Sequence, residues 1–324
     1  MKRLVLIDGN AILHRAFHAL PPLTAPDGSL VNAVYGFTSM LLKLFRDLAP
    51  THLAVAFDRP APTFRKKLFK NYQAQRPEMD EDLSSQVAKV HDMVESFNVP
   101  IFEVDGFEAD DVIATLVNKA TREGIDQVIV VTGDKDLLQL VNDRVFVYML
   151  VRGLTDAKLY DKTEVIAKLG ITPEQIPDFK ALAGDASDNY PGVPGIGPKT
   201  AVQLLVQFKT LGALYRSVSG KKRGNLPETV ILKLKEGRKS ALLGRQLAEI
   251  RTNVPLNKTR TTMAIQSLDT PQARGKLAEY DFQSLLKRLT KEPGKDTNKN
   301  TAGKSEKGKT EKRVTDDTEQ LSLV

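Results

Sequence analysis

The chain has 324 residues, a hydrophobic fraction of 41% and no cysteine, so it can bury a substantial core and has neither disulfides nor thiolate-bound metals. Its four histidines lack the spacing of a zinc site, and any metal must therefore be held mainly by carboxylates. The net charge of +7 and the pI near 9.3 are compatible with a polyanionic partner.

Short apolar runs alternate with helical patterns over the first 171 residues. Continuous β-branched or aliphatic runs at 4–7, 53–57 and 128–131 predict buried parallel strands. Apolar residues at helical spacing predict the intervening helices, over residues 34–45, 83–97 and 110–120. This alternation predicts an α/β domain with a parallel sheet over residues 1–171. Asp8 interrupts the first apolar run too early for a signal peptide, and no later run is long enough for a membrane span, so we expect a cytoplasmic protein.

The composition changes twice in the rest of the chain. From about residue 172 the strand signals stop and short helical patterns follow, separated by prolines. We therefore expect a helical second domain over residues 172–290. Residues 291–324 are rich in Lys, Thr, Asn, Gly and Glu and almost free of large apolar side chains, which predicts a disordered polar tail.

Each predicted strand is followed by an aspartate at or just beyond its C-terminal end: Asp8, Asp58 and Asp134. Ligands bind at this edge of open parallel sheets, so the three side chains are expected to meet there. Six more acids occur in short clusters: Glu108, Asp110, Asp111, Asp136, Asp185 and Asp188. Glu108 and Asp111 are spaced to share one face of a helix, from which Asp110 points away.

Carboxylates gathered in one crevice repel one another strongly unless cations neutralise them. An oxygen-only ligand set suits Mg²⁺ or Mn²⁺, and two such ions hydrolyse phosphodiesters without a histidine base. The alternative is that each acid caps a helix and complements its dipole. That alternative suits any single acid, but it does not account for all nine.

A Gly-hydrophobic-Gly turn from Gly195 to Gly197 is followed at once by a predicted helix with Pro198 at its first position. The free amides of such a helix can bind a phosphate, with Lys199 and Thr200 beside it. A P-loop is improbable because a proline separates the last glycine from the lysine and no strand precedes the turn. A helix-capping turn without a ligand is the alternative.

Nine stretches carry a resemblance to a known family. In chain order they are Leu-Ile-Asp8-Gly9-Asn10, Arg15-Ala-Phe-His-Ala-Leu, Ala33-Val-Tyr35-Gly36-Phe37, Ala-Phe-Asp58, Phe64-Arg65, Gly106-Phe-Glu108-Ala-Asp110-Asp111, Thr132-Gly-Asp134-Lys-Asp136, Gly184-Asp185-Ala-Ser-Asp188-Asn and Gly195-Ile-Gly197-Pro-Lys-Thr-Ala. In this order they resemble the 5′ nuclease family, which includes flap endonucleases, and most closely the 5′ to 3′ exonuclease domain at the N-terminus of bacterial DNA polymerase I. The resemblance covers residues 1 to about 290.

The resemblance implies a PIN-like nuclease domain followed by a helix-hairpin-helix DNA-binding domain. It implies one Mg²⁺ held by Asp8, Asp58, Glu108 and Asp110 or Asp111, and a second nearer Asp134, Asp136, Asp185 and Asp188. Mn²⁺ is expected to substitute for Mg²⁺. The hairpin around Gly195, Gly197, Lys199 and Thr200 is expected to grip duplex DNA, often with K⁺.

The resemblance also implies further DNA contacts. Arg15 and a turn at Tyr35 and Gly36 are expected near substrate phosphates, and residues 60–81 are expected to form a helical arch over single-stranded 5′ ends. The arch would contact DNA through basic and aromatic side chains: Arg65, Lys66, Lys67, Lys70, Tyr72 and Arg76. An ordinary amphipathic helix with a solvated lysine face is the alternative. Gln73 stands where similar proteins usually have lysine, for which Lys67, Lys70 or Arg76 would compensate.

The implied activity is a structure-specific 5′ to 3′ exonuclease and flap endonuclease that removes primers or flaps in DNA replication and repair. Its partners would be DNA with 5′ ends, flaps or nicks and a DNA polymerase in cis or in trans, and the protein would be a nucleoid-associated monomer. A catalytically weak junction-binding module is the first alternative, which Gln73 favours and the full set of acids opposes. A small ribonuclease is the second, but it would lack the second domain and the hairpin.

Overall fold

The computed structural model describes residues 1–153, 156–220, 226–256 and 263–290. The strands are β1 Arg3–Asp8, β2 His52–Ala56, β3 Ile101–Phe102, β4 Gln127–Thr132, β5 Val145–Arg152, β6 Asp156–Tyr160, β7 Gly184–Asp185 and β8 Tyr190–Pro191. The first helices are α1 Gly9–Ala19, α2 Asn32–Leu48, α3 Phe64–Leu68, α4 Glu81–Ser96, α5 Ala109–Arg122 and the 3₁₀ helix η1 Asp136–Leu140. The later ones are α6 Lys162–Leu169, η2 Pro173–Gln175, α7 Ile176–Ala183, α8 Pro198–Phe208, α9 Leu211–Ser219, α10 Glu228–Glu236, α11 Arg238–Ala248, α12 Pro271–Glu279 and α13 Gln283–Leu289.

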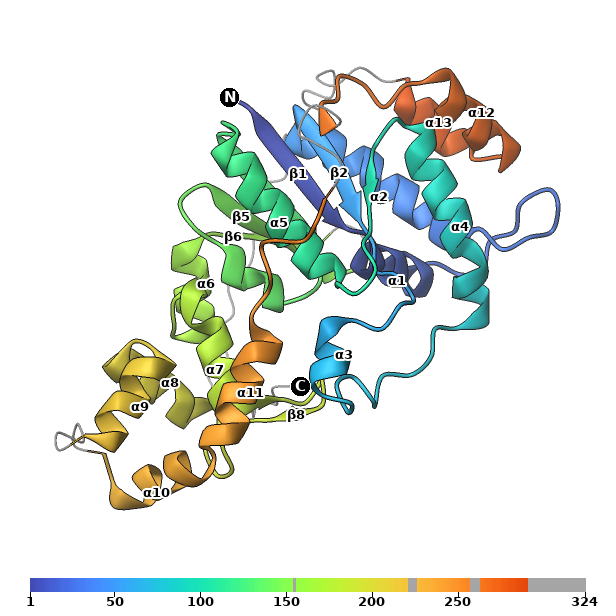
Figure 1. Cartoon of the computed structure of the whole chain (residues 1–324). Coiled ribbons are helices and arrows are strands. Elements are labelled where there is room, and N and C mark those ends of the chain that lie inside the picture. The colour runs from blue at the N-terminus through green and yellow to red at the C-terminus, as the bar shows by residue number, and fades with distance from the viewer. Residues whose placement is uncertain (154–155, 221–225, 257–262, 291–324) are drawn as a thin grey trace, which may run out of the picture.

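A six-stranded sheet with the order β3-β2-β1-β4-β5-β6 forms the centre of the first part of the chain (Figure 1). It is parallel except for β6, which pairs antiparallel with β5. The three predicted strands are confirmed as β1, β2 and β4. Three strands of this sheet were not predicted: β3, which has only two residues, β5, although its sequence is an apolar run, and β6, which is largely exposed.

Helices cover both faces of this sheet because successive side chains of a strand point to opposite faces. Val5 and Ile7 of β1 pack on α1, α2 and α4, whereas Leu4 and Leu6 pack on the side of α5. The predicted helices are confirmed as α2, α4 and α5. The two layers leave the C-terminal edge of the strands uncovered by these helices, and the predicted acids follow the strands at that edge.

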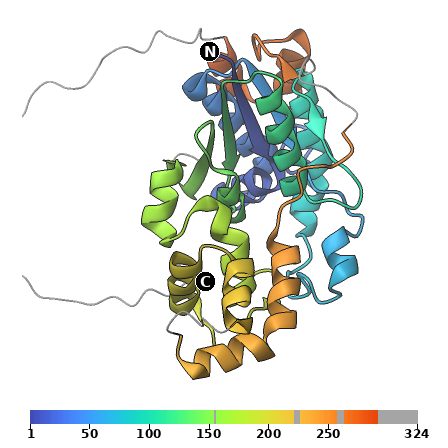
Figure 2. The same cartoon turned by 60° about the vertical axis from the view of Figure 1, so that its left-hand side comes forward.

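Helices α6 to α11 form the second part of the chain, to the side of the C-terminal edge of the sheet (Figures 1 and 2). Their apolar side chains continue the core on the α5 side without a break. Two observations correct the expectation of one helical domain over residues 172–290. The short strands β7 and β8 form an antiparallel pair, and α12 and α13 return to the first part, where Leu277 and Phe282 join the core of α2 and α4.

The segment over residues 60–81 contains one short helix, α3, followed by turns. It is therefore less helical than the arch that the resemblance implies. None of the described helices is long and apolar enough to cross a membrane. The predicted disordered tail lies outside the described residues.

Candidate active site

Backbone and hydroxyl donors fix the three acids that follow the parallel strands. Asp8 ends β1, caps α1 by accepting from the amide of Ala11 at 3.0 Å, and accepts from the hydroxyl of Thr132 at 2.7 Å. Asp58 accepts from the amide of Ala109 at 2.7 Å, at the start of α5. Asp134 accepts from the amide of Asp136 at 2.8 Å. The strand ends and helix starts therefore hold these carboxylates in fixed orientations.

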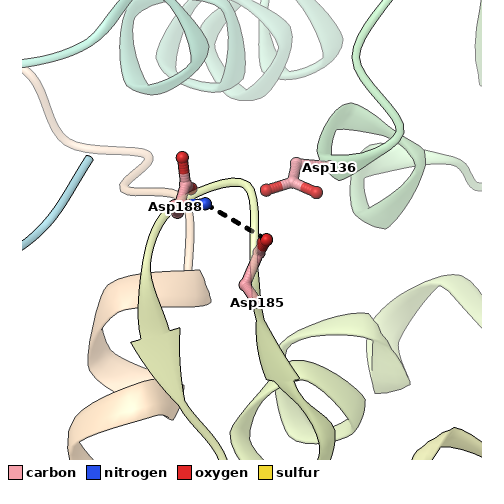
Figure 3. A group of neighbouring side chains, drawn as sticks. All are labelled: Asp136, Asp185 and Asp188. Atoms are coloured by element: carbon pink, nitrogen blue, oxygen red, sulfur yellow. Dashed lines mark hydrogen bonds between the residues drawn. The ribbon is translucent and has the colours of Figure 1, made fainter. Parts of the chain in front are cut away.

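Seven of the nine predicted acids line one pocket of about 260 Å³ at this edge: Asp8, Asp58, Glu108, Asp110, Asp134, Asp136 and Asp188. Asp185 lies beside the pocket. One oxygen each of Asp136, Asp185 and Asp188 lies within 4.8 Å of the others, a group that fits a metal ion (Figure 3). The structure thus brings eight of the nine predicted acids together at this edge.

Burial and mutual repulsion raise the pKa of several of these carboxyls. Burial raises the pKa of Asp8 to about 7, although hydrogen bonds from Thr132 and Ala11 lower it. Burial likewise raises the pKa of Glu108 and of Asp136 to about 7. The pKa of Asp110 rises through burial and then through the nearby Asp134 and Asp8. Such a pocket favours the uptake of either protons or cations, and an oxygen-only donor set of this kind fits hard divalent cations.

A lysine from the helical part contacts two acids of the group Asp136, Asp185 and Asp188. The ammonium of Lys180, in α7, forms ion pairs with both Asp136 and Asp185. Burial alone would raise the pKa of Asp185, but its ion pair with Lys180 and hydrogen bond from Ser187 lower it overall. Figure 3 shows Asp185 and Asp188 on the hairpin of β7 and β8, with the amide of Asp188 3.3 Å from the Asp185 carboxylate. Lys180 was not among the residues predicted from the sequence.

Three side chains of the segment after α3 contact the carboxylate of Asp188. The Tyr72 hydroxyl donates to it at 3.0 Å, the Gln73 side-chain amide at 3.0 Å and the Arg76 guanidinium at 2.9 Å. Tyr72 is buried and also donates to Glu108 at 3.2 Å, so it is not the exposed stacking surface that was expected. Arg76 is half-exposed at the pocket, as a phosphate contact requires.

Asp111 and Arg65 form a buried ion pair, which corrects two predictions. The Arg65 guanidinium donates to both Asp111 oxygens, at 2.7 and 3.0 Å, and the exposed fractions of the two residues are 2% and 0%. Arg65 also donates to the carbonyl oxygens of Leu247 and Glu249. Asp111 therefore does not line the pocket as a metal ligand. Arg65 is not free to guide DNA, since it joins α3 to α5 and to the residues at the end of α11.

Three other residues that were predicted to contact DNA have close neighbours within the protein. Tyr35 and Gly36 are inside α2 and do not form a turn. A side chain at Gly36 would collide with Ala16 of α1, and the Tyr35 ring packs edge-on against Phe282, the residue before α13. Arg15 donates to the carbonyl oxygens of Leu150 and Gly153, so its guanidinium is tied to the end of β5.

The remaining basic side chains of this segment are exposed, as expected. Lys66 donates to the carbonyl oxygen of Tyr72 at 2.8 Å, and Lys67 and Lys70 lie on the surface of the molecule. Two polar residues of the pocket were not predicted: Asn10, which accepts from the amide of Asp58 at 2.9 Å, and His14, whose pKa burial lowers. Both lie in α1, which begins directly after Asp8, and their spacing of four residues places them on one face of that helix, which is the signal that could have found them.

The glycine turn has the geometry that its sequence predicts. Gly195 has a φ of +77°, which favours glycine, and Gly197 caps α8 with Pro198 at the first helical position. Lys199 is exposed beside the free amides of this helix and Thr200 is partly exposed. The Lys233 ammonium donates to the Gly195 carbonyl oxygen at 3.1 Å. The turn therefore presents a helix N-terminus and positive charge to solvent.

A mostly parallel sheet with an acidic pocket at its C-terminal edge, followed by a helical part, defines a PIN-like nuclease fold. Two family models match the chain: the 5′-3′ exonuclease N-terminal resolvase-like domain over residues 3–170, and the 5′-3′ exonuclease C-terminal SAM fold over residues 171–271. The chain belongs to the 5′-3′ exonuclease family and is a nuclease.

DNA polymerase I of Bacillus caldotenax is 42% identical over 288 residues, and that of Bacillus subtilis is 42% identical over 291 residues. Each match covers 89% of this chain and 32% of the relative, so the chain spans about a third of their length. Among solved structures, the T5 D15 protein co-crystallized with metal ions has a TM-score of 0.65 at 19% identity, with 89% of this chain and 97% of that chain covered. The catalytic core of Rad2 in complex with DNA has a TM-score of 0.57 at 16% identity, with 89% and 91% covered. At these identities the solved structures show that the fold is shared.

Proposed function

We propose that this nuclease is a structure-specific 5′ to 3′ exonuclease and flap endonuclease that hydrolyses DNA phosphodiesters with two Mg²⁺ ions. The observation that carries the proposal is the single pocket lined by seven carboxylates at the C-terminal edge of the sheet. Membership of the 5′-3′ exonuclease family supports the polarity of cutting. The DNA complex of Rad2 and the metal ions of the T5 D15 protein support the same substrate and cofactor class.

The donor set divides into two groups. Asp8, Asp58, Asp110 and Asp134 would hold one cation, with Glu108 at the pocket wall, and Asp136, Asp185 and Asp188 would hold the other. Asp134, which was expected near the second ion, is assigned to the first because it is not one of the three aspartates whose oxygens converge within 4.8 Å. Divalent cations bound there supply the Lewis acidity that activates water for attack on phosphorus and stabilises the departing oxygen. Mn²⁺ would serve in place of Mg²⁺, because both ions prefer oxygen ligands.

The remaining residues bind and orient DNA. Arg76 holds its guanidinium at the pocket, where it would meet the phosphate next to the cut. Tyr72 and Gln73 fix the carboxylate of Asp188 through hydrogen bonds, and so act as positioning residues. The amides at the start of α8, with Lys199, would hold a phosphate of the duplex, with K⁺ bound at the turn. Lys67 and Lys70 supply positive charge to a single-stranded 5′ end.

The proposed context is primer and flap removal in DNA replication and repair, in the cytoplasm and at the nucleoid. The chain matches the 5′-3′ exonuclease family model, and the relatives named above are DNA polymerases. This similarity supports joint action with a polymerase in cis or in trans.

Cleavage of a 5′-labelled flap duplex tests the proposal. With Mg²⁺ we expect short labelled products released near the junction, and with EDTA none. Asp110→Asn should lose cutting while still binding the duplex, whereas Asp269→Asn, at an exposed ion pair with Arg274, should cut like the wild type. Binding of the junction without any cut would instead support the catalytically weak binding module.

A further inference from the structure

The two groups of acids in the pocket differ in the cations that the protein itself supplies. Lys180 is paired with Asp136 and Asp185, and Arg76 is paired with Asp188 at 2.9 Å. In the part of the chain that the structure describes, no Lys or Arg forms an ion pair with Asp8, Asp58, Asp110 or Asp134, although Arg65 pairs at 3.3 Å with Glu108 at the wall of this group. Two cations of the protein therefore offset the three carboxylates of one group, whereas the four aspartates of the other are left to protons or to an added cation.

The Lys180 side chain connects the helical part of the chain to the acidic pocket. It belongs to α7 of the helical part, yet its ammonium contacts a carboxylate at the start of η1 and another on the β7–β8 hairpin. Only 15% of its side chain is exposed. Since the same two carboxylates and that of Asp188 are the ones whose oxygens converge within 4.8 Å, a divalent ion and the ammonium compete for the same oxygens.

We propose that Lys180 is an internal counter-ion of the cluster Asp136, Asp185 and Asp188, and that a divalent cation binds this cluster by displacing the Lys180 ammonium. The inference rests on the cation binding that the proposed function assigns to the pocket. Lys180 is a positioning residue in this scheme. It keeps the carboxylates together and in place while no ion is bound, because it neutralises their repulsion.

The displacement makes the two cation sites unequal. The group without an internal counter-ion binds its cation first, and the cluster held by Lys180 and Arg76 binds the second cation more weakly. A displaced ammonium beside a divalent ion is repelled by it. A DNA phosphate beside the displaced ammonium would relieve this repulsion, so the second ion would bind more tightly when DNA is present.

Binding of Mn²⁺ without DNA, followed by electron paramagnetic resonance, tests the proposal. The wild type should bind one ion tightly and one weakly. In Lys180→Met the weak ion should bind at least about tenfold more tightly, because one positive charge at contact distance is gone. Lys180→Arg keeps the charge and should keep the weak affinity. Lys162→Met, at an exposed ion pair with Glu174, should leave both affinities unchanged.

An affinity of the second ion that stays within about twofold in Lys180→Met, or two equal affinities in the wild type, overturns the proposal. A second measurement avoids any folding defect of Lys180→Met. In ¹⁵N-lysine-labelled wild type, the Lys180 ammonium signal, assigned by its absence in Lys180→Arg, should shift with the weaker phase of a Mg²⁺ titration. A signal unmoved after both sites are saturated refutes displacement. Neither measurement uses DNA, so a chain that shows this ion binding but cuts no flap refutes the proposed nuclease mechanism alone.

Discussion

The buried pair of Arg65 and Asp111 gives the sharpest prediction, because it decides whether Asp111 serves stability or metal binding. Arg65→Met removes two hydrogen bonds to the Asp111 carboxylate and those to the carbonyl oxygens of Leu247 and Glu249. Asp111 keeps the amides of Arg251 and Glu108 as donors, but its charge, at 0% exposure, is left without a counter-charge in direct contact.

Removing one partner of a buried ion pair typically costs about 3–5 kcal/mol, because the other charge stays desolvated. We therefore expect Arg65→Met to lower the free energy of unfolding in EDTA by about 3–5 kcal/mol, measured by urea denaturation followed by circular dichroism. Arg59→Met is the matched control, since the ion pairs of Arg59 with Glu103 and Asp105 lie at the surface. That variant should unfold at the wild-type urea concentration.

The companion variant Asp111→Asn separates the two roles of the carboxylate. If Asp111 is structural, Asp111→Asn destabilises the protein and leaves the Mn²⁺ affinities within about twofold of the wild type. If Asp111 is a metal ligand, the metal-free variant keeps its stability and loses affinity for Mn²⁺. The second result, or a loss below about 1 kcal/mol in Arg65→Met, would refute the assignment of this pair to the fold.

Three further predictions concern pH, the turn and DNA. The folded-state pKa of Asp8 is raised to about 7, so the stability that protonated Asp8 contributes to the metal-free protein is present below pH 4 and is lost as the pH rises through 7. Asp8→Asn should therefore show a smaller loss of unfolding free energy over this pH range in urea denaturation. The affinity for Mg²⁺, measured by calorimetry, should rise over the same range. Gly195→Ala should cost about 1–3 kcal/mol in urea denaturation, since the φ of +77° is strained for alanine and its Cβ would lie 2.9 Å from Lys233. Lys199→Ala should weaken duplex binding without sequence bias and lower the slope of binding affinity against salt concentration by about one phosphate contact. Each prediction has its own contradicting result. These are a weaker pH dependence of stability in the wild type than in Asp8→Asn, a urea midpoint of Gly195→Ala equal to that of the wild type, and a salt slope of Lys199→Ala equal to that of the wild type.

The predictions from sequence succeeded where the signal is local. Strands β1, β2 and β4 are short apolar runs, and Asp8, Asp58 and Asp134 follow them at the edge where parallel strands end, so their convergence follows from topology. The turn before α8 was predicted for the same reason, since its glycines and proline act on neighbouring residues only.

The errors arise where a side chain finds its partner far away in the chain. Asp111 carries a charge in the first turn of a helix, like Asp110, and only the fold brings Arg65, 46 residues away, into contact with it. Lys180 looks like an ordinary helical lysine, because its partnership with Asp136 depends on how the helical part packs on the sheet. No periodicity or spacing reports such contacts.

The central claim is that acids from distant segments bind a pair of hard cations in one pocket. Anomalous scattering from crystals grown with Mn²⁺ tests it most directly. We predict two peaks, one coordinated by oxygens from the group of Asp8, Asp58, Asp110 and Asp134, the other by the cluster of Asp136, Asp185 and Asp188. A map without peaks among these carboxylates, at Mn²⁺ concentrations that support flap cutting, would contradict the account.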